Sequence, residues 1–209
     1  MPLDTIEQVV LRRGSSRKFA HTPISLGQLS TMLDRATRGV HADFLDPPGA
    51  QLNDLYLIVH AVDGLDSGAY VFHRDRGLLE CLKQRDFREQ AGYLGLEQGL
   101  PADAAVDVFF LADLRPILQH MGNRGYRAVQ LEAGILDGKL YLAAYAQRLG
   151  ATGLTFYGGS GKVPIKGQAA SRTDFLASSH QPTKVLRRTT GTISDNKKYL
   201  SRVAFMKFA

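Results

Sequence analysis

A run of nine residues near the N-terminus, Leu11 to Phe19, contains the side chains best suited to chemistry. Four cations surround two hydroxyls and one glycine in this run, namely Arg12, Arg13, Arg17 and Lys18 with Ser15, Ser16 and Gly14. Guanidinium groups bind phosphate oxygens in pairs, and serine hydroxyls satisfy the remaining lone pairs. The run therefore predicts an anion site. Taken alone, it is equally consistent with a solvated basic helix end, where cations complement the helix dipole.

Other patterns that carry chemistry are weak or absent in the sequence. The six histidines and the single cysteine show no metal-ligand spacing, so we expect no metal site. The sequence has no Gly-x-Ser-x-Gly elbow, and no glycine-rich nucleotide loop follows a predicted strand. Glu132 lies in an apolar helical stretch, where it is either a general base or a carboxylate satisfied by internal partners.

The elements that must position the anion segment follow from hydrophobic periodicity. Helices are expected over residues 4–13 (capped by Asp4), 25–36 (capped by Ser25), 114–121 and 126–149, with two short ones over 76–95, and strands over 55–62, 69–73, 106–112 and 152–157. Cys81, in an apolar run, is expected to pack in the core. Strands interleaved with helices around one long helix indicate an α+β domain in three layers.

Charge divides the chain into two parts. The net charge is +6, yet residues 162–207 alone hold ten Lys and Arg against two Asp, while the rest of the chain is slightly acidic. We therefore expect a folded domain over 1–157 and a basic, polar, partly irregular tail over 158–209, with a terminal strand at 199–208. The tail has few aromatic residues and no recognition motif, so nucleic acid is an unlikely partner.

The sequence carries no signal for a membrane or an oxidising compartment. No apolar run is long enough for a membrane span, and the N-terminus lacks the basic and apolar regions of a signal peptide. A single cysteine excludes an intrachain disulfide framework. We expect a cytoplasmic protein that does not bind membranes.

Four motifs in a fixed order resemble a known family. The segment Arg13–Phe19 is similar to the Arg-Arg-Ser-x-Arg-x-Phe opening of the FMN-dependent nitroreductase superfamily. Gly64–His73 resembles the Gly-Leu-x-x-Gly-x-Tyr hairpin of its SagB-type dehydrogenase branch, Asn123–Gly134 the start of that branch's central helix, and Leu149–Tyr157 the strand after it. The resemblance covers residues 5–157.

This resemblance implies a nitroreductase-like α+β sandwich with a mixed or antiparallel sheet, usually an intertwined homodimer with FMN at the subunit interface. By position, Arg13, Ser15 and Arg17 would contact the FMN phosphate, ribityl chain and pyrimidine edge. The loop Pro47, Pro48 and Gly49, with Gln51, falls where the partner subunit covers the flavin. Thr155 and Phe156 fall where backbone amides face flavin N5, and Phe156 is expected to narrow the pocket.

Three departures from the family pattern matter for the site. Gly14 stands where relatives have a second arginine, so one cation is missing or is supplied by Arg12. His120 and Met121 replace a Lys-Tyr pair of azoline-oxidising members; His120 is a weak candidate for a catalytic base, and otherwise a surface histidine. A late cation that reaches the phosphate in relatives has three candidates here, Lys184, Arg187 and Arg188.

The function that the resemblance implies is that of an FMN-dependent oxidoreductase. The flavin would take a hydride from NAD(P)H and pass electrons to an electron-poor small molecule such as a nitro compound or quinone, or oxidise a small or peptide-derived substrate. The alternative is a non-catalytic flavin- or nucleotide-binding module with a basic tail that binds polyanions.

Overall fold

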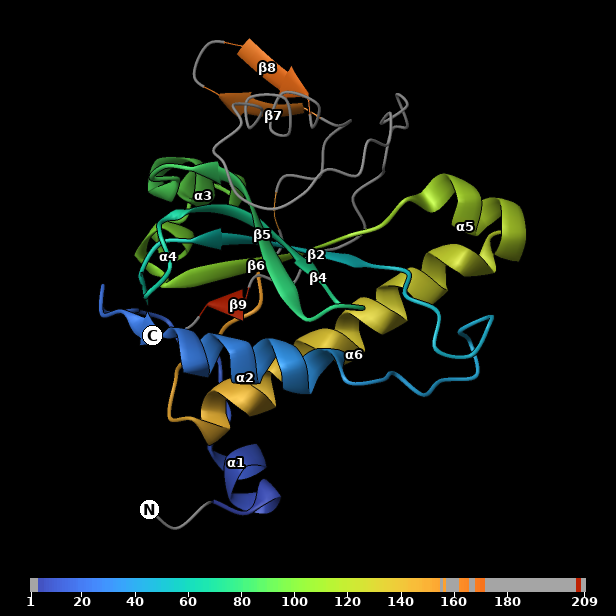
Figure 1. Ribbon diagram of the computed structural model, residues 1–209, viewed down its shortest axis with the longest axis horizontal. Helices are drawn as coiled ribbons and strands as arrows, with labels where there is room; N and C mark the ends of the chain where they lie inside the picture. The colour runs from blue at the N-terminus through green and yellow to red at the C-terminus, as the bar shows by residue number, and fades with distance from the viewer. Residues whose placement is uncertain (1–3, 155, 157–161, 166–167, 172–205, 208–209) are drawn as a thin grey trace.

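A five-stranded antiparallel sheet forms the centre of the protein (Figure 1). The computed structural model describes residues 4–154, 156, 162–165, 168–171 and 206–207. The sheet has the order β5-β4-β2-β6-β9, with bounds Leu78–Gln84, Gly68–His73, Asp54–Val59, Val106–Leu111 and Met206–Lys207. Two short pairs lie outside it, β1 (Ile24–Ser25) with β3 (Val62–Asp63) and β7 (Lys162–Ile165) with β8 (Gln168–Ser171).

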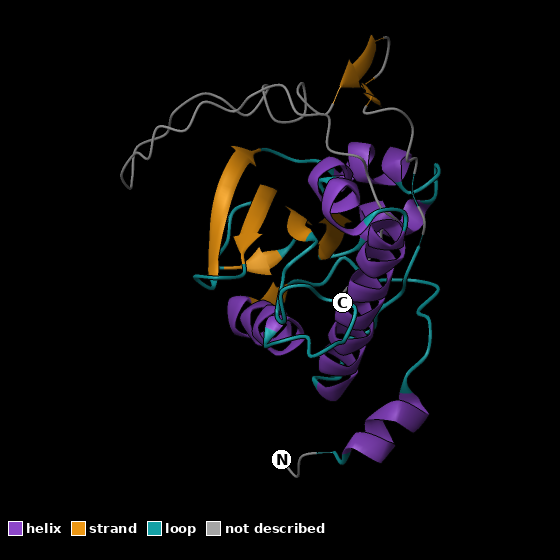
Figure 2. Ribbon diagram, turned by 90° about the vertical axis from the view of Figure 1, so that its right-hand side faces the viewer, coloured by secondary structure: helices purple, strands orange, loops and turns teal. Residues whose placement is uncertain are grey.

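Helices cover both faces of this sheet (Figures 1 and 2). Their bounds are α1 Ile6–Arg12, α2 Leu26–Thr37, α3 Arg88–Leu94, α4 Gly99–Asp103, α5 Leu114–Met121 and α6 Arg124–Ala146. Alternate strand residues face opposite sides. Leu57 and Phe110 share a buried cluster with α2 and α6, whereas Ile58 and Phe109 share another with α3. Both faces of β2 and β6 are therefore covered, and the predicted three-layer α+β fold is confirmed.

Capping residues set where the first two helices begin. Ser25 caps α2 as predicted: its hydroxyl accepts from the backbone N–H of Gln28, whose side chain accepts from the N–H of Ser25. The cap of α1 is Thr5, with a matching box to Gln8, so the prediction of Asp4 as the cap was wrong. Asp4 is instead an acceptor for two arginine side chains that come from α1 and from the end of α6.

The hairpin motif Gly-Leu-x-x-Gly-x-Tyr is explained by local structure. Gly64 has a φ of +82°, which a residue with a Cβ adopts only under strain. A Cβ on Gly68 would lie 2.6 Å from the carbonyl oxygen of Lys83 on β5. The Tyr70 hydroxyl donates to the carbonyl of Asp66 over 2.7 Å, which closes the turn. These motif residues therefore build the β4–β5 edge of the sheet and contribute no side chain to the anion segment.

Gly68→Ala is expected to destabilise the fold by about 1–3 kcal/mol, because the new methyl group overlaps the backbone of the neighbouring strand. Urea unfolding followed by circular dichroism measures the change. Gly27→Ala is the matched control: its Cβ would meet only the Ser25 hydroxyl at 3.8 Å in the exposed first turn of α2. That variant should be neutral or slightly stabilising. Equal losses in both variants would contradict the close-approach explanation.

Four sequence predictions fail in detail. Residues 78–84 form the strand β5 and not a helix. The spacing of Leu78, Leu79 and Leu82 fits both a helical and a strand period, and pairing with β4 selects the strand. Cys81 is consequently exposed on this edge strand and is not in the core. The long helix ends at Ala146, three residues before the predicted end, and Arg148 then takes a left-handed φ of 62°. Residues 152–154, predicted as the start of a strand, have no regular structure.

Little of the basic tail falls within the described residues. β9 lies inside the range predicted for a terminal strand and pairs with β6 through the register Asp107 to Lys207. The three late cations, Lys184, Arg187 and Arg188, lie outside the described residues. Among the helices that the structure describes, none combines the length and the apolar character needed to cross a bilayer.

Candidate functional site

The anion segment is held against the C-terminal half of α6. The Tyr145 hydroxyl donates to the carbonyl of Gly14 over 2.9 Å and lies 3.4 Å from the Ser16 hydroxyl. The backbone N–H of Ser16 donates to the carbonyl of Ala151 over 2.9 Å. These contacts place residues 13–17 beside the segment that leads to Thr155 and Phe156. The anion segment therefore lies beside residues 151–154, which directly precede the second group of predicted site residues in the sequence.

The predicted phosphate donors are exposed and, among the described residues, donate to no protein acceptor. Arg13, Ser15 and Arg17 are all exposed. Within the described part of the chain, the side chains of Ser15 and Arg17 have no hydrogen bond or ion pair, and the Arg13 guanidinium lies over the ring of Tyr141 without a hydrogen bond. Two guanidinium groups and a hydroxyl without protein acceptors are the donor set that a phosphate ester needs. FMN therefore fits the residues present.

Arg12, the suggested replacement for the missing family arginine, is used elsewhere. Its guanidinium donates to Asp4 over 2.7 Å and to the carbonyl of Tyr145 over 2.7 Å. Arg148 donates to the second oxygen of the same Asp4, also at 2.7 Å. Hydrogen bonds from these two arginines help hold the pKa of the Asp4 carboxyl below its usual range. Arg12 thus anchors α1 to α6, which leaves Arg13 and Arg17 as the remaining arginines of the anion segment.

The Phe156 side chain packs on the central sheet. Its ring packs edge-on against Phe109 of β6, with ring centroids 5.8 Å apart and planes at 87°. Phe156 therefore joins the apolar cluster on the α3 side of the sheet. Thr155, the other predicted neighbour of flavin N5, lies outside the described residues.

The loop with Pro47, Pro48, Gly49 and Gln51 lies at the opposite end of α6 from the anion segment. All four of these residues are exposed, and the backbone N–H of Ala50 donates to the carbonyl of Pro47. The loop runs on into residues that contact Glu132, whereas the anion segment contacts Tyr145, thirteen residues further along the same helix. At 1.5 Å per residue this separation is roughly 20 Å. A single subunit therefore does not bring the loop to the anion segment.

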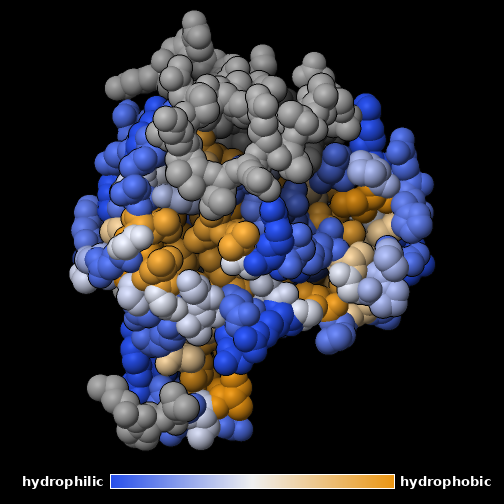
Figure 3. Space-filling view, viewed as in Figure 1, coloured by the Kyte–Doolittle hydropathy of each residue, from blue (hydrophilic) through white to orange (hydrophobic). Residues whose placement is uncertain are grey.

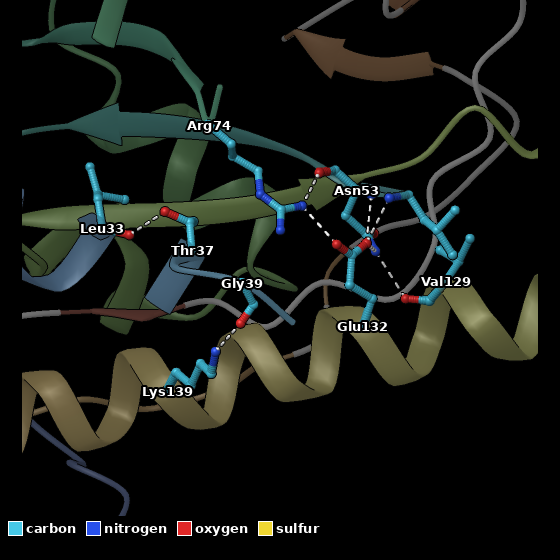
Figure 4. Close-up of polar contacts among 9 residues, drawn as sticks. Leu33, Thr37, Gly39, Asn53, Arg74, Val129, Glu132 and Lys139 are labelled. Atoms are coloured by element: carbon cyan, nitrogen blue, oxygen red, sulfur yellow. Dashed lines mark hydrogen bonds and ion pairs between the residues drawn. The ribbon is translucent and has the colours of Figure 1, made fainter. Parts of the chain in front are cut away.

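A buried carboxylate fixes the position of this loop (Figure 4). Glu132 Oε2 accepts from the backbone N–H groups of Leu52 and Asn53 and from the Asn53 side chain, each at 2.9 Å. Glu132 Oε1 accepts from Arg74 Nη1 at 2.7 Å. The carboxylate is 0% exposed and the Arg74 side chain 5%. Glu132 is thus satisfied by internal partners, and the alternative reading of it as a general base is not supported.

His120 lies beside the same loop. Its Nε2 is 3.3 Å from Asp46 Oδ2, and both side chains are well exposed, at 62% and 72%. His120 comes from the end of α5, and Asp46 directly precedes Pro47. His120 is therefore paired with a carboxylate that can orient its ring. The pair lies at the start of the loop that the family resemblance predicts to cover a flavin.

Sequence reasoning missed three residues on one face of α6. Asp137, Tyr141 and Tyr145 are spaced by four residues, so they lie one above another and face the anion segment and residues 151–154. Their four-residue spacing, which places all three polar side chains on one face of the helix, is the signal that would have found them. Asp137 and Tyr141 lie next to Arg13, as described below.

Sequence comparison places the chain among known proteins. The model of the nitroreductase family matches residues 10–158. A protein of Methanocaldococcus jannaschii named "Putative nitroreductase" is 27% identical over 150 residues, which cover 69% of this chain and 75% of that protein.

Solved structures share the fold at low identity. A "putative nitroreductase" from Anabaena variabilis superimposes with a TM-score of 0.71 at 22% identity, over 97% of this chain. The match spans only 37% of the Anabaena chain, so the chain described here corresponds to little more than a third of that protein. A chain of the E. coli microcin synthetase complex, solved with a truncated pro-microcin bound, gives a TM-score of 0.63 at 13% identity, over 94% of this chain and 68% of its own length.

Proposed function

The chain belongs to the nitroreductase family, and from this premise we propose that it is an FMN-dependent oxidoreductase that acts on a small molecule, with NAD(P)H as the electron donor. The observation that carries the proposal is the exposed donor set of Arg13, Ser15 and Arg17, held by the Ser16–Ala151 hydrogen bond beside the segment leading to Phe156. Bound FMN would supply hydride transfer, which side chains alone do not provide.

The residues of this chain would bind and orient the cofactor. Arg13 and Arg17 would hold the phosphate, and the Ser15 hydroxyl would contact the phosphate or ribityl chain. Residues 151–154 have no regular structure, so backbone amides of this segment other than that of Gly153, which donates to Tyr141, would be donors to the flavin ring. The Phe156 side chain, packed on Phe109, would keep this backbone in place.

The second half of the site would come from a second copy of the chain. Ile6, Val10 and Leu11 of α1 are 57%, 49% and 86% exposed, and α1 projects from the body, where Figure 3 shows apolar surface. On α6, Leu131 is 52% exposed, and open space surrounds Gly134 and Gly138. A partner that covers these surfaces would bring its own residues 47–51 to the anion segment. We therefore propose a homodimer.

The catalytic acid or base in this proposal is His120 of the subunit that supplies the loop. The neighbouring Asp46 would orient the ring, whose nitrogens can donate or accept a proton. The assignment to the SagB-type branch is also part of the proposal. It rests on the four motifs, of which the hairpin Gly64–His73 adopts the turn that its glycines and Tyr70 imply.

Retention of FMN tests the proposed function. Purified protein, incubated with FMN and passed through gel filtration, should elute at the volume of a dimer with the two absorption bands of oxidised flavin. A colourless protein that retains no FMN after this treatment would overturn the proposal, and a steep salt-dependent affinity for DNA would then favour a polyanion-binding role.

Arg17→Ala is expected to weaken FMN binding by roughly tenfold or more, because a hydrogen bond to a charged group contributes about 1.5–3 kcal/mol. The dissociation constant follows from quenching of flavin fluorescence. Lys18→Ala removes an adjacent exposed cation that we do not place in the site and should change the affinity by less than threefold. Unchanged affinity in Arg17→Ala would show that the phosphate contact is assigned to the wrong residue.

A further inference from the structure

Asp137 lies in the wall of the anion site, on the helix that supports it. It is one turn before Tyr141 on α6, and Tyr141 is buried, with its hydroxyl oxygen accepting from the backbone N–H of Gly153. A Cβ added to Gly153 would lie 3.6 Å from that hydroxyl and 3.9 Å from Asp137 Oδ2. Asp137 and Tyr141 therefore both lie beside the backbone of Gly153, in the segment that precedes the predicted flavin contacts.

The Arg13 guanidinium lies over the ring of Tyr141. Its guanidinium carbon is 5.6 Å from the centroid of the Tyr141 ring, and its positive field acts on Asp137. Asp137 Oδ1 is buried and, among the described residues, has no hydrogen-bond partner. The carboxylate thus has one nearby cation and no donor on this oxygen. The same cation is one of the two proposed to bind the phosphate.

Other charged groups near this end of α6 are directed elsewhere. Asp4, Arg12 and Arg148 pair with one another beyond Tyr145. Lys139 on α6 donates to the carbonyl of Gly39, toward the loop after α2. The segment 151–154 contributes backbone and no charged side chain, and Tyr145 donates to Gly14. Of the described charged groups, Arg13 is therefore the one whose field stabilises the ionised form of Asp137.

We propose that Asp137 is a specificity-determining residue of the anion site: it shares Arg13 with the bound phosphate, so that the site takes a dianion more tightly when Asp137 is neutral. This inference rests on the proposed function in one respect, the role of Arg13 as a phosphate contact. Phosphate binding near neutral pH would then be accompanied by uptake of one proton from solvent onto the Asp137 carboxylate.

The protonation state of Asp137 changes within the pH range in which it would affect phosphate binding. Burial raises the pKa of the Asp137 carboxyl to about 6, against the opposing field of Arg13. The ordinary pKa of this carboxyl is 3.8, so the unfolded chain loses the proton at a lower pH than the folded protein does. The free energy of unfolding therefore falls as the pH rises from 3.8 to about 6. Asp137→Asn should therefore raise the melting temperature at pH 8 and leave it nearly unchanged at pH 4.

Sulfate tests the inference directly, because it stays a dianion between pH 5 and pH 8 while phosphate does not. Sulfate affinity, measured by thermal shift, should be roughly three- to tenfold weaker at pH 8 than at pH 5 in the unaltered protein. Asp137→Asn should reduce this ratio to less than twofold and bind sulfate more tightly than the unaltered protein at pH 8. The variant keeps all six histidines, so their titration is common to both proteins.

Two outcomes would overturn the inference: the same pH dependence in both proteins, or no sulfate binding at either pH. A second measurement, of affinity for FMN and for riboflavin, distinguishes failure of this inference from failure of the proposed function. At pH 8, Asp137→Asn should increase affinity for FMN several-fold and leave affinity for riboflavin, which lacks the phosphate, unchanged. Equal gains for both flavins would also contradict it. If neither flavin binds the unaltered protein, the proposed function fails, and the sulfate measurement still decides the role of Asp137.

Discussion

Arg74→Ala is expected to lower the free energy of unfolding by about 3–5 kcal/mol, the cost of leaving one member of a buried ion pair without its partner. The Glu132 carboxylate is 0% exposed and would lose the donor on Oε1, 2.7 Å away. Its remaining donors all converge on Oε2, so they do not replace Arg74. Urea denaturation followed by circular dichroism gives the change, with the midpoint shifting and the slope constant.

Two further variants show whether the loss comes from the buried charge. Arg38→Ala removes an exposed pair with Asp34, at 2.8 Å and with side chains 63% and 47% exposed, and should cost at most about 1 kcal/mol. Glu132→Gln, added to Arg74→Ala, removes the uncompensated charge and should recover part of the stability. A loss below about 1 kcal/mol for Arg74→Ala would contradict the account of this ion pair.

The second large effect concerns assembly: Leu11→Glu is expected to convert a dimer into a monomer. Leu11 is 86% exposed on the projecting helix α1, where burial in a partner would contribute about 1.5–3 kcal/mol and an unpaired charge would cost more. The dissociation constant of the dimer should rise by about a hundredfold or more. Analytical ultracentrifugation over a range of concentrations measures it.

Loss of the dimer should also release FMN, because residues 47–51 lie roughly 20 Å along α6 from the anion segment of their own subunit. Leu78→Glu is the matched control, since Leu78 is 54% exposed on the edge strand β5 and belongs to neither α1 nor α6. The control should remain dimeric and retain FMN. A Leu11→Glu protein that is still dimeric, or monomeric with full FMN affinity, would show that the second half of the site is not supplied across this surface.

Local signals in the sequence were sufficient for much of the fold. Ser25 and Gln28 mark the start of α2, and the alternation of Leu57 with Ile58 on β2 follows from a strand that is covered on both faces. The order of four motifs led to the correct family and to the anion segment. The edge strand β5 was misread because Leu78, Leu79 and Leu82 satisfy a helical period as well, and only pairing with β4 distinguishes the two.

Contacts between distant residues could not be predicted. Glu132 is satisfied by Leu52, Asn53 and Arg74, which are 58–80 residues away in the sequence. The anion segment is positioned by Ser16 and Ala151. No local pattern encodes such pairs, since they depend on how α6 lies across the sheet. The role of Asp137 was missed for the same reason, although its spacing from Tyr141 and Tyr145 was visible.

The central claim is that this chain forms a flavin site that exchanges electrons with a nicotinamide. An anaerobic titration of the FMN-loaded protein with NADH and with NADPH tests it most directly, with the visible flavin bands as the readout. One of the two nucleotides is expected to bleach these bands at about one equivalent per bound flavin. Bands that persist in excess NADH and NADPH, but bleach with dithionite, would contradict it and favour a non-catalytic flavin-binding role.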